Sequence, residues 1–201
     1  MNRSIPRLAF DLERDVRSLV TMASHLTPYL YEDELYGHLA GDLPKLTLGG
    51  LLLRLYRLER LGDQLSAEQV LQVQQARAQL DLARAQWALH YENKIKRELE
   101  TRVNAFELFL NDCEEDLAAC VAHYPVQAEK RTIIHHLVRE ASALEIFDAR
   151  LQVRIKAVDR RLREMLRPGE CIVDERLCRV YPQAEFWWLY GSLSEQRSEQ
   201  D

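Results

Sequence analysis

The sequence predicts an all-α fold: a helical bundle with a long antiparallel, coiled-coil-like helical hairpin and a small irregular or β-hairpin C-terminal segment. The chain of 201 residues holds only 7 Gly and 6 Pro, so few positions force a helix to end. Two long stretches, residues 66–124 and 126–167, contain neither residue type. In both stretches, apolar residues recur at alternating steps of three and four, which is the period of an amphipathic helix.

The N-terminal part, residues 6–62, is expected to form three helices. Ser4 suits the cap of the first helix, over about residues 6–26. A short helix over about residues 29–40 should follow, because acidic residues at its start suit the helix dipole and a glycine follows its end. Thr47 suits the cap of the third helix, whose leucine-rich face is apolar enough to be central.

Residues 66–124 and 126–167 are expected to form two long helices packed as an antiparallel hairpin. Ser66 opens a capping box at the start of the first helix. If the chain reverses between the two helices, facing residues should have numbers that add to about 250. Asp148 is a charged residue in the otherwise apolar second stripe. Pairing with Arg102 across the seam would offset the cost of burying it and fix the register.

The C-terminal part, residues 169–191, is expected to be an aromatic segment with a small β-hairpin and a short helix. Residues 192–201 are expected to be a disordered tail. The chain is therefore predicted to be a single helical domain over residues 1–191. Trp187 and Trp188 are expected to anchor the C-terminus on the bundle, and as exposed residues they would instead form a partner-binding site.

Composition and charge indicate a soluble, cytoplasmic protein. Hydrophobic residues make up 47% of the chain and charged residues 29%, and the net charge is −5. No apolar run is long enough to span a membrane, and the N-terminus lacks the apolar segment of a secretory signal. The four cysteines, Cys113, Cys120, Cys171 and Cys178, include no CxxC pair and are expected to be reduced.

A carboxylate–histidine cluster is the candidate for metal chemistry. His136 and Glu140 lie four residues apart on one helix face, and the expected register sets Glu114 and Glu115 opposite them. The apolar seam beside His136 favours a structural role, and the chain has no Glu-x-x-His pair of the kind that di-iron bundles use. We therefore expect no metal site, no cofactor and no catalytic residue, and a metal-dependent enzyme is the third functional interpretation.

A basic helix face is the basis of the second functional interpretation, a nucleic-acid-associated regulator. Aromatic stacking residues are not interleaved with its charges, which favours a solvated face instead. The arginines of this face are Arg150, Arg154, Arg160, Arg161, Arg163 and Arg167.

The leading functional interpretation is a non-enzymatic interaction or scaffold protein that binds a protein partner or itself. In the expected hairpin, the first helix extends beyond the end of the second and carries its own apolar residues. Val73, Leu80 and Trp87 are therefore predicted to contribute to a homodimer interface.

Overall fold

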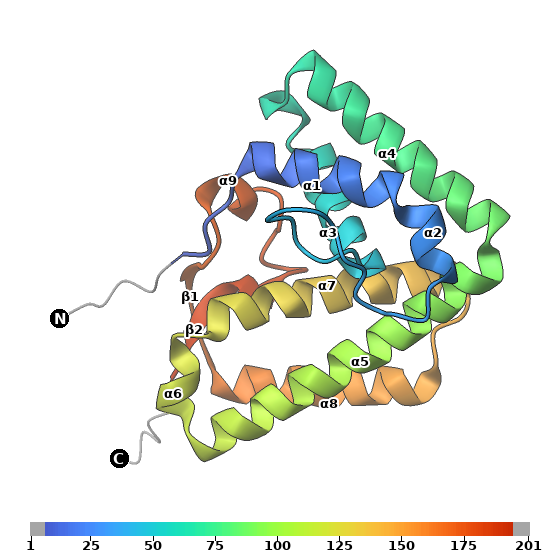
Figure 1. Ribbon diagram of the computed structural model, residues 1–201. Helices are drawn as coiled ribbons and strands as arrows, with labels where there is room; N and C mark the ends of the chain where they lie inside the picture. The colour runs from blue at the N-terminus through green and yellow to red at the C-terminus, as the bar shows by residue number, and fades with distance from the viewer. Residues whose placement is uncertain (1–6, 195–201) are drawn as a thin grey trace, which may run out of the picture. The chain divides into compact units, whose positions relative to one another are not determined.

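The structure, a computed structural model, describes residues 7–194. Helices predominate, and a small two-stranded antiparallel sheet lies near the C-terminal end, so the predicted all-α class is confirmed (Figure 1). The helices are α1 (Leu12–Ser24), α2 (Leu26–Tyr31), α3 (Leu48–Arg60), α4 (Ala67–Gln86), α5 (Ala88–Glu115), α6 (Leu117–Val121), α7 (Tyr124–Ala143), α8 (Ala149–Met165) and α9 (Glu175–Cys178). The short 3-10 helices are η1 (Gly62–Gln64) and η2 (Trp187–Leu189), and the strands are β1 (Leu166–Cys171) and β2 (Tyr190–Leu193).

The chain forms two compact units. Two of the boundaries between them fall inside α5 and α7, and the other two fall just before α1 and α8. The N-terminal unit comprises residues 11–101 and 133–147. Within the described residues, the C-terminal unit comprises 7–10, 102–132 and 148–194.

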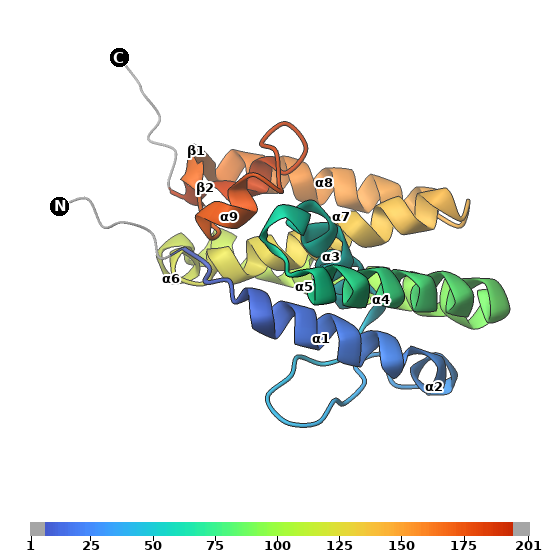
Figure 2. The ribbon, with the colours of Figure 1, turned by 90° about the horizontal axis from the view of Figure 1, so that it is seen from above.

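In the N-terminal unit, α1 packs along both α3 and α4, and α2 also contacts α4. The views in Figure 1 and Figure 2 agree that α1 and α4 run side by side. The leucine-rich α3 is central, as predicted, because Leu51, Leu55 and Leu58 are fully buried. Two predicted caps are confirmed: Thr47 accepts a hydrogen bond from the Gly50 N–H, and Ser66 forms a capping box with Gln69.

The start of α3 meets α5 and α7 at a glycine. A Cβ atom on Gly49 would lie 2.5 Å from Ile133 Cγ2 and 2.7 Å from Glu98 Oε1, so a larger residue would not fit. The buried Glu98 carboxylate accepts a hydrogen bond from the Gly49 N–H at 3.0 Å. A carboxylate in this place is favoured by the unpaired N–H groups and the positive dipole at a helix N-terminus.

In the C-terminal unit, α8 lies beside the second half of α5. Arg154 donates to Glu107 and Arg161 donates to Glu114, and in both cases the residue numbers differ by 47. Because both numbers of the pair increase together, α8 runs parallel to α5. The predicted antiparallel register, in which facing residues add to about 250, is therefore wrong for this helix.

Both predicted long helices are interrupted. The first has a kink at Trp87 and ends at Glu115, and the Asp116 side chain caps α6 by accepting a hydrogen bond from the Ala119 N–H. The second ends at Ala143. There Glu145 has a left-handed conformation with φ of 57°, and the chain turns before α8 begins.

The predicted role of Asp148 in a helix seam is also wrong. Its carboxylate is exposed and caps α8, because it accepts hydrogen bonds from the backbone N–H groups of Arg150 at 2.6 Å and Leu151 at 3.1 Å. An aspartate at this position satisfies N–H groups that the first turn of a helix leaves unpaired. No partner across a seam is needed to explain it.

The first two helices also differ from their predicted ranges. Helix α1 begins at Leu12 with Asp11 as its cap, whereas the predicted cap, Ser4, lies outside the described residues. Helix α2 ends at Tyr31, where Glu32 becomes extended, so most of the helix predicted over residues 29–40 is a loop.

Predictions for the C-terminal part are corrected in three respects. Helix α9 occupies the predicted hairpin turn, and the strands that pair are β1 and β2, with Leu166 opposite Leu193. Strand β2 includes the first two residues of the expected tail, whereas residues 195–201 lie outside the described part. The cysteines are not reduced: the disulfides are Cys113–Cys120 and Cys171–Cys178.

Candidate interaction site

The inner face of α4 contains two of the predicted interface residues. Val73 and Leu80 are 4% and 1% exposed, and they lie on the buried side of α4. Because α1 of the same chain packs along α4, these residues are part of the core. The prediction that they contact a second copy is wrong. Trp87 is half-buried, and its ring packs edge-on against Tyr31 with 4.9 Å between ring centroids.

The opposite face of α4 carries a second row of residues, here called the outer stripe. Successive members are separated by four, three, four and three residues, which is the heptad spacing of a helix that packs against another helix. All members are exposed, and Leu71 and Leu82 are 53% and 56% exposed. The outer stripe consists of Leu71, Gln75, Ala78, Leu82 and Ala85.

Between positions 71 and 86, the flanks of the outer stripe carry few charges, and the arginines among them are paired. Four glutamines flank it, namely Gln72, Gln74, Gln79 and Gln86. The charged residues between positions 71 and 86 are Arg77, Asp81 and Arg84. Arg77 pairs with Glu59 at 2.8 Å, and Arg84 pairs with Asp81 at 3.2 Å, so these charges are neutralised within the chain.

Further apolar residues are exposed just beyond the end of α4. Leu89, in the first turn of α5 after the kink at Trp87, is 68% exposed. Nearby, Tyr31 is 50% exposed, and its ring contacts those of Trp87 and His90. Exposed aromatic and leucine side chains that share a surface are typical of protein-binding sites.

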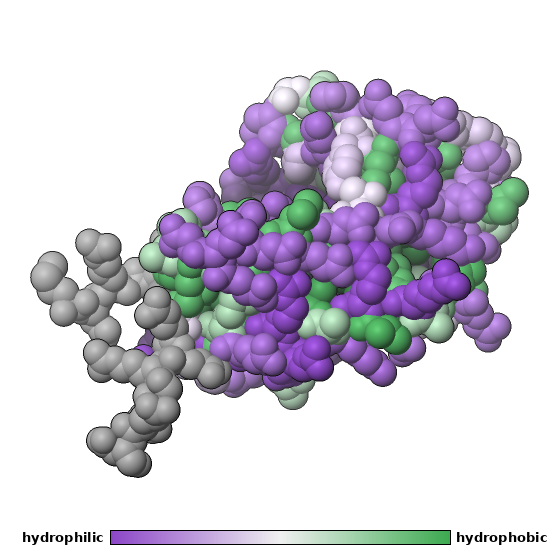
Figure 3. All heavy atoms as spheres, turned by 90° about the horizontal axis from the view of Figure 1, so that it is seen from below, coloured by the Kyte–Doolittle hydropathy of each residue, from purple (hydrophilic) through white to green (hydrophobic). Residues whose placement is uncertain are grey.

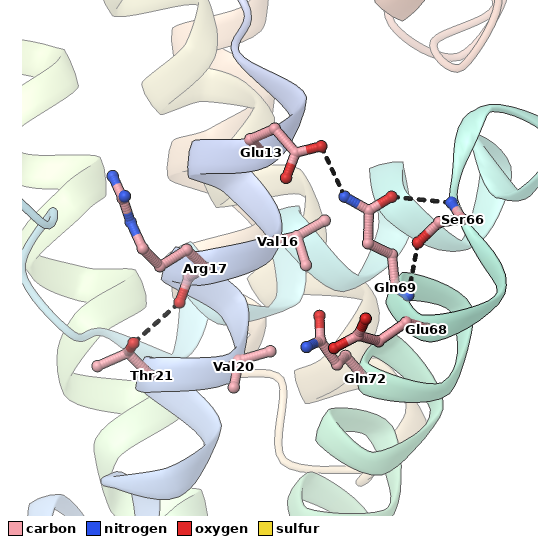
Figure 4. Close-up of a pocket in the computed structure, with 9 residues that line it drawn as sticks. All are labelled: Glu13, Val16, Arg17, Val20, Thr21, Ser66, Glu68, Gln69 and Gln72. Carbon is pink, nitrogen blue, oxygen red and sulfur yellow. Dashed lines mark hydrogen bonds between the residues drawn. The ribbon is translucent and has the colours of Figure 1, made fainter.

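A hollow of about 520 Å³ lies between α1 and the first turns of α4 (Figure 4). Its valines come from α1 and face the polar side chains of α4. Glu13 accepts a hydrogen bond from Gln69 at 2.8 Å, and Gln69 also caps α4 through Ser66. These polar groups therefore join the two helices, and the hollow is a seam between them. Its lining residues are Glu13, Val16, Arg17, Val20, Thr21, Ser66, Glu68, Gln69 and Gln72.

The candidate metal residues have other roles in the N-terminal unit. His136 is buried against the Tyr56 ring, with 4.5 Å between centroids. Burial and the positive charges of nearby histidine and arginine residues lower the pKa of His136 to about 2, so its imidazole is neutral. A cation is disfavoured beside these positive charges. Glu140 accepts hydrogen bonds from the Tyr91 hydroxyl at 2.8 Å and from Arg84 at 3.3 Å.

The other two candidate ligands belong to the C-terminal unit. Glu114 accepts a hydrogen bond from Arg161 at 2.8 Å, and Glu115 is exposed. Across residues 7–194, no group of three or more His, Cys, Asp or Glu side chains is arranged to hold a metal ion. The structure thus offers no support for the metal-dependent interpretation.

The aromatic anchor is confirmed within the C-terminal unit. Trp188 is 2% exposed, and its indole N–H donates to the Thr132 hydroxyl at 2.9 Å. The Tyr124 hydroxyl donates to the Trp188 carbonyl at 2.6 Å. Trp188 is therefore not available to a partner. Trp187 is half-buried, and the Arg163 guanidinium lies 3.7 Å from the centre of its ring.

The basic face of α8 divides into two groups. Arg154 and Arg161 are directed to carboxylates of α5, as described above. Arg150, Arg160 and Arg167 are exposed, as is Arg163 above the Trp187 ring. The sequence pattern identified the basic region but not which arginines are paired inside the unit.

Figure 3 shows a face on which hydrophilic side chains predominate and hydrophobic ones lie singly or in small groups. Isolated exposed residues such as Leu108 and Val153 are common on proteins and need no special explanation. The outer stripe differs, because its apolar residues share one helix face at heptad spacing. It is the surface best suited to binding, although the sequence analysis missed it.

No helix in residues 7–194 is long and apolar enough to cross a bilayer. No protein-family model matches the chain, and no similar curated protein or solved structure was found. The candidate function therefore depends on the geometry described above.

Proposed function

We propose that the chain is a non-enzymatic interaction protein that self-associates through the outer stripe of α4. The observation that carries this proposal is the exposed heptad row on a helix whose inner face is already packed. An ordinary surface helix is polar on its outer side. Here leucine and alanine occupy four of the five positions in the row, and solvation alone does not account for them.

The spacing of the outer stripe suits a helical partner. Alternating steps of four and three keep the row facing one neighbouring helix along its length, and the alanines on either side of Leu82 leave holes for the partner's side chains. Leu71 and Leu82 would be the main apolar contacts. Ala78 and Ala85 allow the two helix backbones to approach closely.

The chemistry of the flanks favours a second copy of the same chain as the partner. The protein carries a net charge of −5, so most surfaces of two copies repel each other weakly. Between positions 71 and 86, however, the charges beside the outer stripe are internally paired. A glutamine amide both donates and accepts hydrogen bonds, so the flanking glutamines are compatible with their own counterparts in a symmetric dimer.

The size of the surface predicts a weak dimer. Helix α4 has 20 residues, which makes it about 30 Å long and roughly 10–12 Å wide. Two such strips cover roughly 700 Å², whereas stable interfaces bury about 1,200–2,000 Å². We therefore expect a dissociation constant on the order of 100 µM, unless the exposed residues around Leu89 and Tyr31 extend the interface.

Sedimentation equilibrium at increasing concentration tests this proposal. The wild type should approach twice the 23.5 kDa chain mass, whereas Leu82→Glu should remain at one chain mass because it places a charge in the contact. Leu108→Glu is the matched control, since Leu108 is 63% exposed and lies on α5 outside the outer stripe. A wild type that stays monomeric throughout, or equal weakening by both substitutions, would contradict the proposal.

The cellular location is not part of this proposal. The expectation of a cytoplasmic protein depended partly on reduced cysteines, whereas the structure has two disulfides. Disulfides are typical of oxidising compartments and also occur in intracellular proteins of hyperthermophiles. They therefore remove one of the arguments for a cytoplasmic location.

A further inference from the structure

We propose a second binding site, independent of the outer stripe: the exposed cations of α8 bind the phosphate backbone of duplex nucleic acid. The site is a row of four cations, here called the cationic row. Its members are separated by four, three and four residues and are all exposed. The cationic row consists of Lys156, Arg160, Arg163 and Arg167.

The spacing places the side chains of Lys156, Arg160 and Arg163 on one side of α8. Residues three and four apart are neighbours on a helix surface, so the first three cations form a continuous line. Arg167 follows immediately after the helix, as the second residue of β1. With a rise of about 1.5 Å per residue, the helical part of the row, from Lys156 to Arg163, is roughly 10 Å long. Arg150 adds a fifth exposed cation near the start of α8.

On the inner side of α8, carboxylates of the C-terminal unit pair with arginines. Glu107 and Glu114 accept hydrogen bonds from Arg154 and Arg161, and Asp159 accepts two from Arg131 at 2.7 Å. These are the inward-facing ion pairs of the helix.

The cations of the row lack such partners. Within residues 7–194, no ion pair joins a member of the cationic row to a carboxylate. Glu164 is the exposed acidic residue beside them on α8. The outer side of α8 is therefore strongly positive, although the whole chain is acidic.

A line of cations is complementary to a linear polyanion. Lysine and arginine contacts to phosphates provide most of the affinity in sequence-independent nucleic-acid binding. Single-strand binding relies on free aromatic faces for stacking. Here the Arg163 guanidinium covers Trp187 at 3.7 Å, so a duplex backbone fits better.

A membrane surface fits the same cations less well. Helices that lie on a bilayer insert a row of large apolar side chains beside their basic residues. On α8 the large apolar side chain that is exposed is Val153. This difference favours nucleic acid over anionic lipid as the ligand.

Fluorescence anisotropy with a short labelled DNA duplex tests the proposal, with the salt concentration varied from about 25 to 200 mM. Four phosphate contacts predict that log K falls with log salt at a slope of about −3.6. Lys156→Gln with Arg160→Gln should make the slope shallower by about 1.8. Arg154→Gln with Arg161→Gln is the matched control, because it removes the same charge from the inner side of α8 and should leave the slope unchanged.

Circular dichroism and thermal melting of each variant show whether it is folded. The proposal is overturned if the duplex does not bind at the lowest salt concentration, or if both double variants change the slope equally. It is also overturned if the protein binds vesicles of phosphatidylserine and phosphatidylcholine but not the duplex. The proposal is supported if the slope of log K against log salt changes in the Lys156→Gln, Arg160→Gln variant and not in the control variant.

Discussion

Replacing Glu145 with glycine should stabilise the protein, because this residue ends α7 in a left-handed conformation. Its φ is 57°, a region that residues with a Cβ atom rarely adopt. The Glu145 N–H donates to the Ser142 carbonyl at 3.1 Å, and the Ile146 N–H donates to the Ala141 carbonyl at 2.9 Å. These two bonds define a Schellman motif, in which glycine is the usual residue at the position of Glu145.

The magnitude follows from two opposing terms. A non-glycine residue in the left-handed region costs about 1–2 kcal/mol, which glycine would recover. Glycine also gives the unfolded chain more freedom, which costs roughly 0.4–1 kcal/mol. The net expectation for Glu145→Gly is a gain of about 0.5–1 kcal/mol in the free energy of unfolding. For a chain of this size, that gain corresponds to an increase in Tm of about 1–4 °C.

Urea unfolding followed by circular dichroism measures this difference, and Glu100→Gly is the matched control. Glu100 is exposed in the interior of α5, where glycine should cost about 1 kcal/mol. Replacing glutamate with glycine should therefore increase the free energy of unfolding at position 145 and decrease it at position 100. If Glu145→Gly destabilises the protein as much as Glu100→Gly does, the helix continues through this position and the reasoning is refuted.

Two further predictions concern pH and reduction. In the unfolded chain the His136 imidazole is protonated below about pH 6.5, whereas in the folded protein its pKa is about 2 and it stays neutral. Lowering the pH from about 7 to 5 should therefore decrease the free energy of unfolding by about 2 kcal/mol. His136→Gln should remove this loss in chemical unfolding, and an unchanged pH dependence would count against it. Each disulfide closes a loop between cysteines seven residues apart, so reduction should cost about 2–3 kcal/mol per bridge. Mass spectrometry after mild reduction should find Cys171–Cys178 open first, because Cys113 and Cys120 are buried, and the reverse order would contradict this.

The sequence supported the fold class and several helix starts because these depend on local chemistry. The scarcity of glycine and proline, the capping threonine at Thr47 and the capping box at Ser66 all act within a few residues. The end of α7 was missed for the same reason. A glutamate replaces the usual glycine there, so the local sequence contains no stop signal.

Asp148 shows a second limit of pattern-based prediction. A lone acidic residue in an apolar stripe fits both a polar seam position and a helix cap. Only the chain direction after Glu145 distinguishes the two, and that direction depends on tertiary structure. The assumption of one continuous helix therefore led to both the wrong register and the wrong partner for this residue.

The outer stripe was missed because α4 carries apolar residues on both faces. The row through Val73 and Leu80 was identified, and its exposure was inferred from the expected hairpin. The structure packs this row against α1 and exposes the opposite row through Leu71 and Leu82. Sequence periodicity shows that such rows exist, but the position of α1 decides which one remains available to a partner.

Hydrogen exchange of the wild-type protein at two concentrations tests the central claim, self-association through α4, most directly. Backbone amides exchange more slowly where a contact stabilises the helix, and mass action populates the dimer as the concentration increases from about 5 to 500 µM. We predict slower exchange at the higher concentration in Ala67–Gln86 and no change in α8. Exchange that does not depend on concentration, or slowing confined to segments other than α4, would contradict the claim.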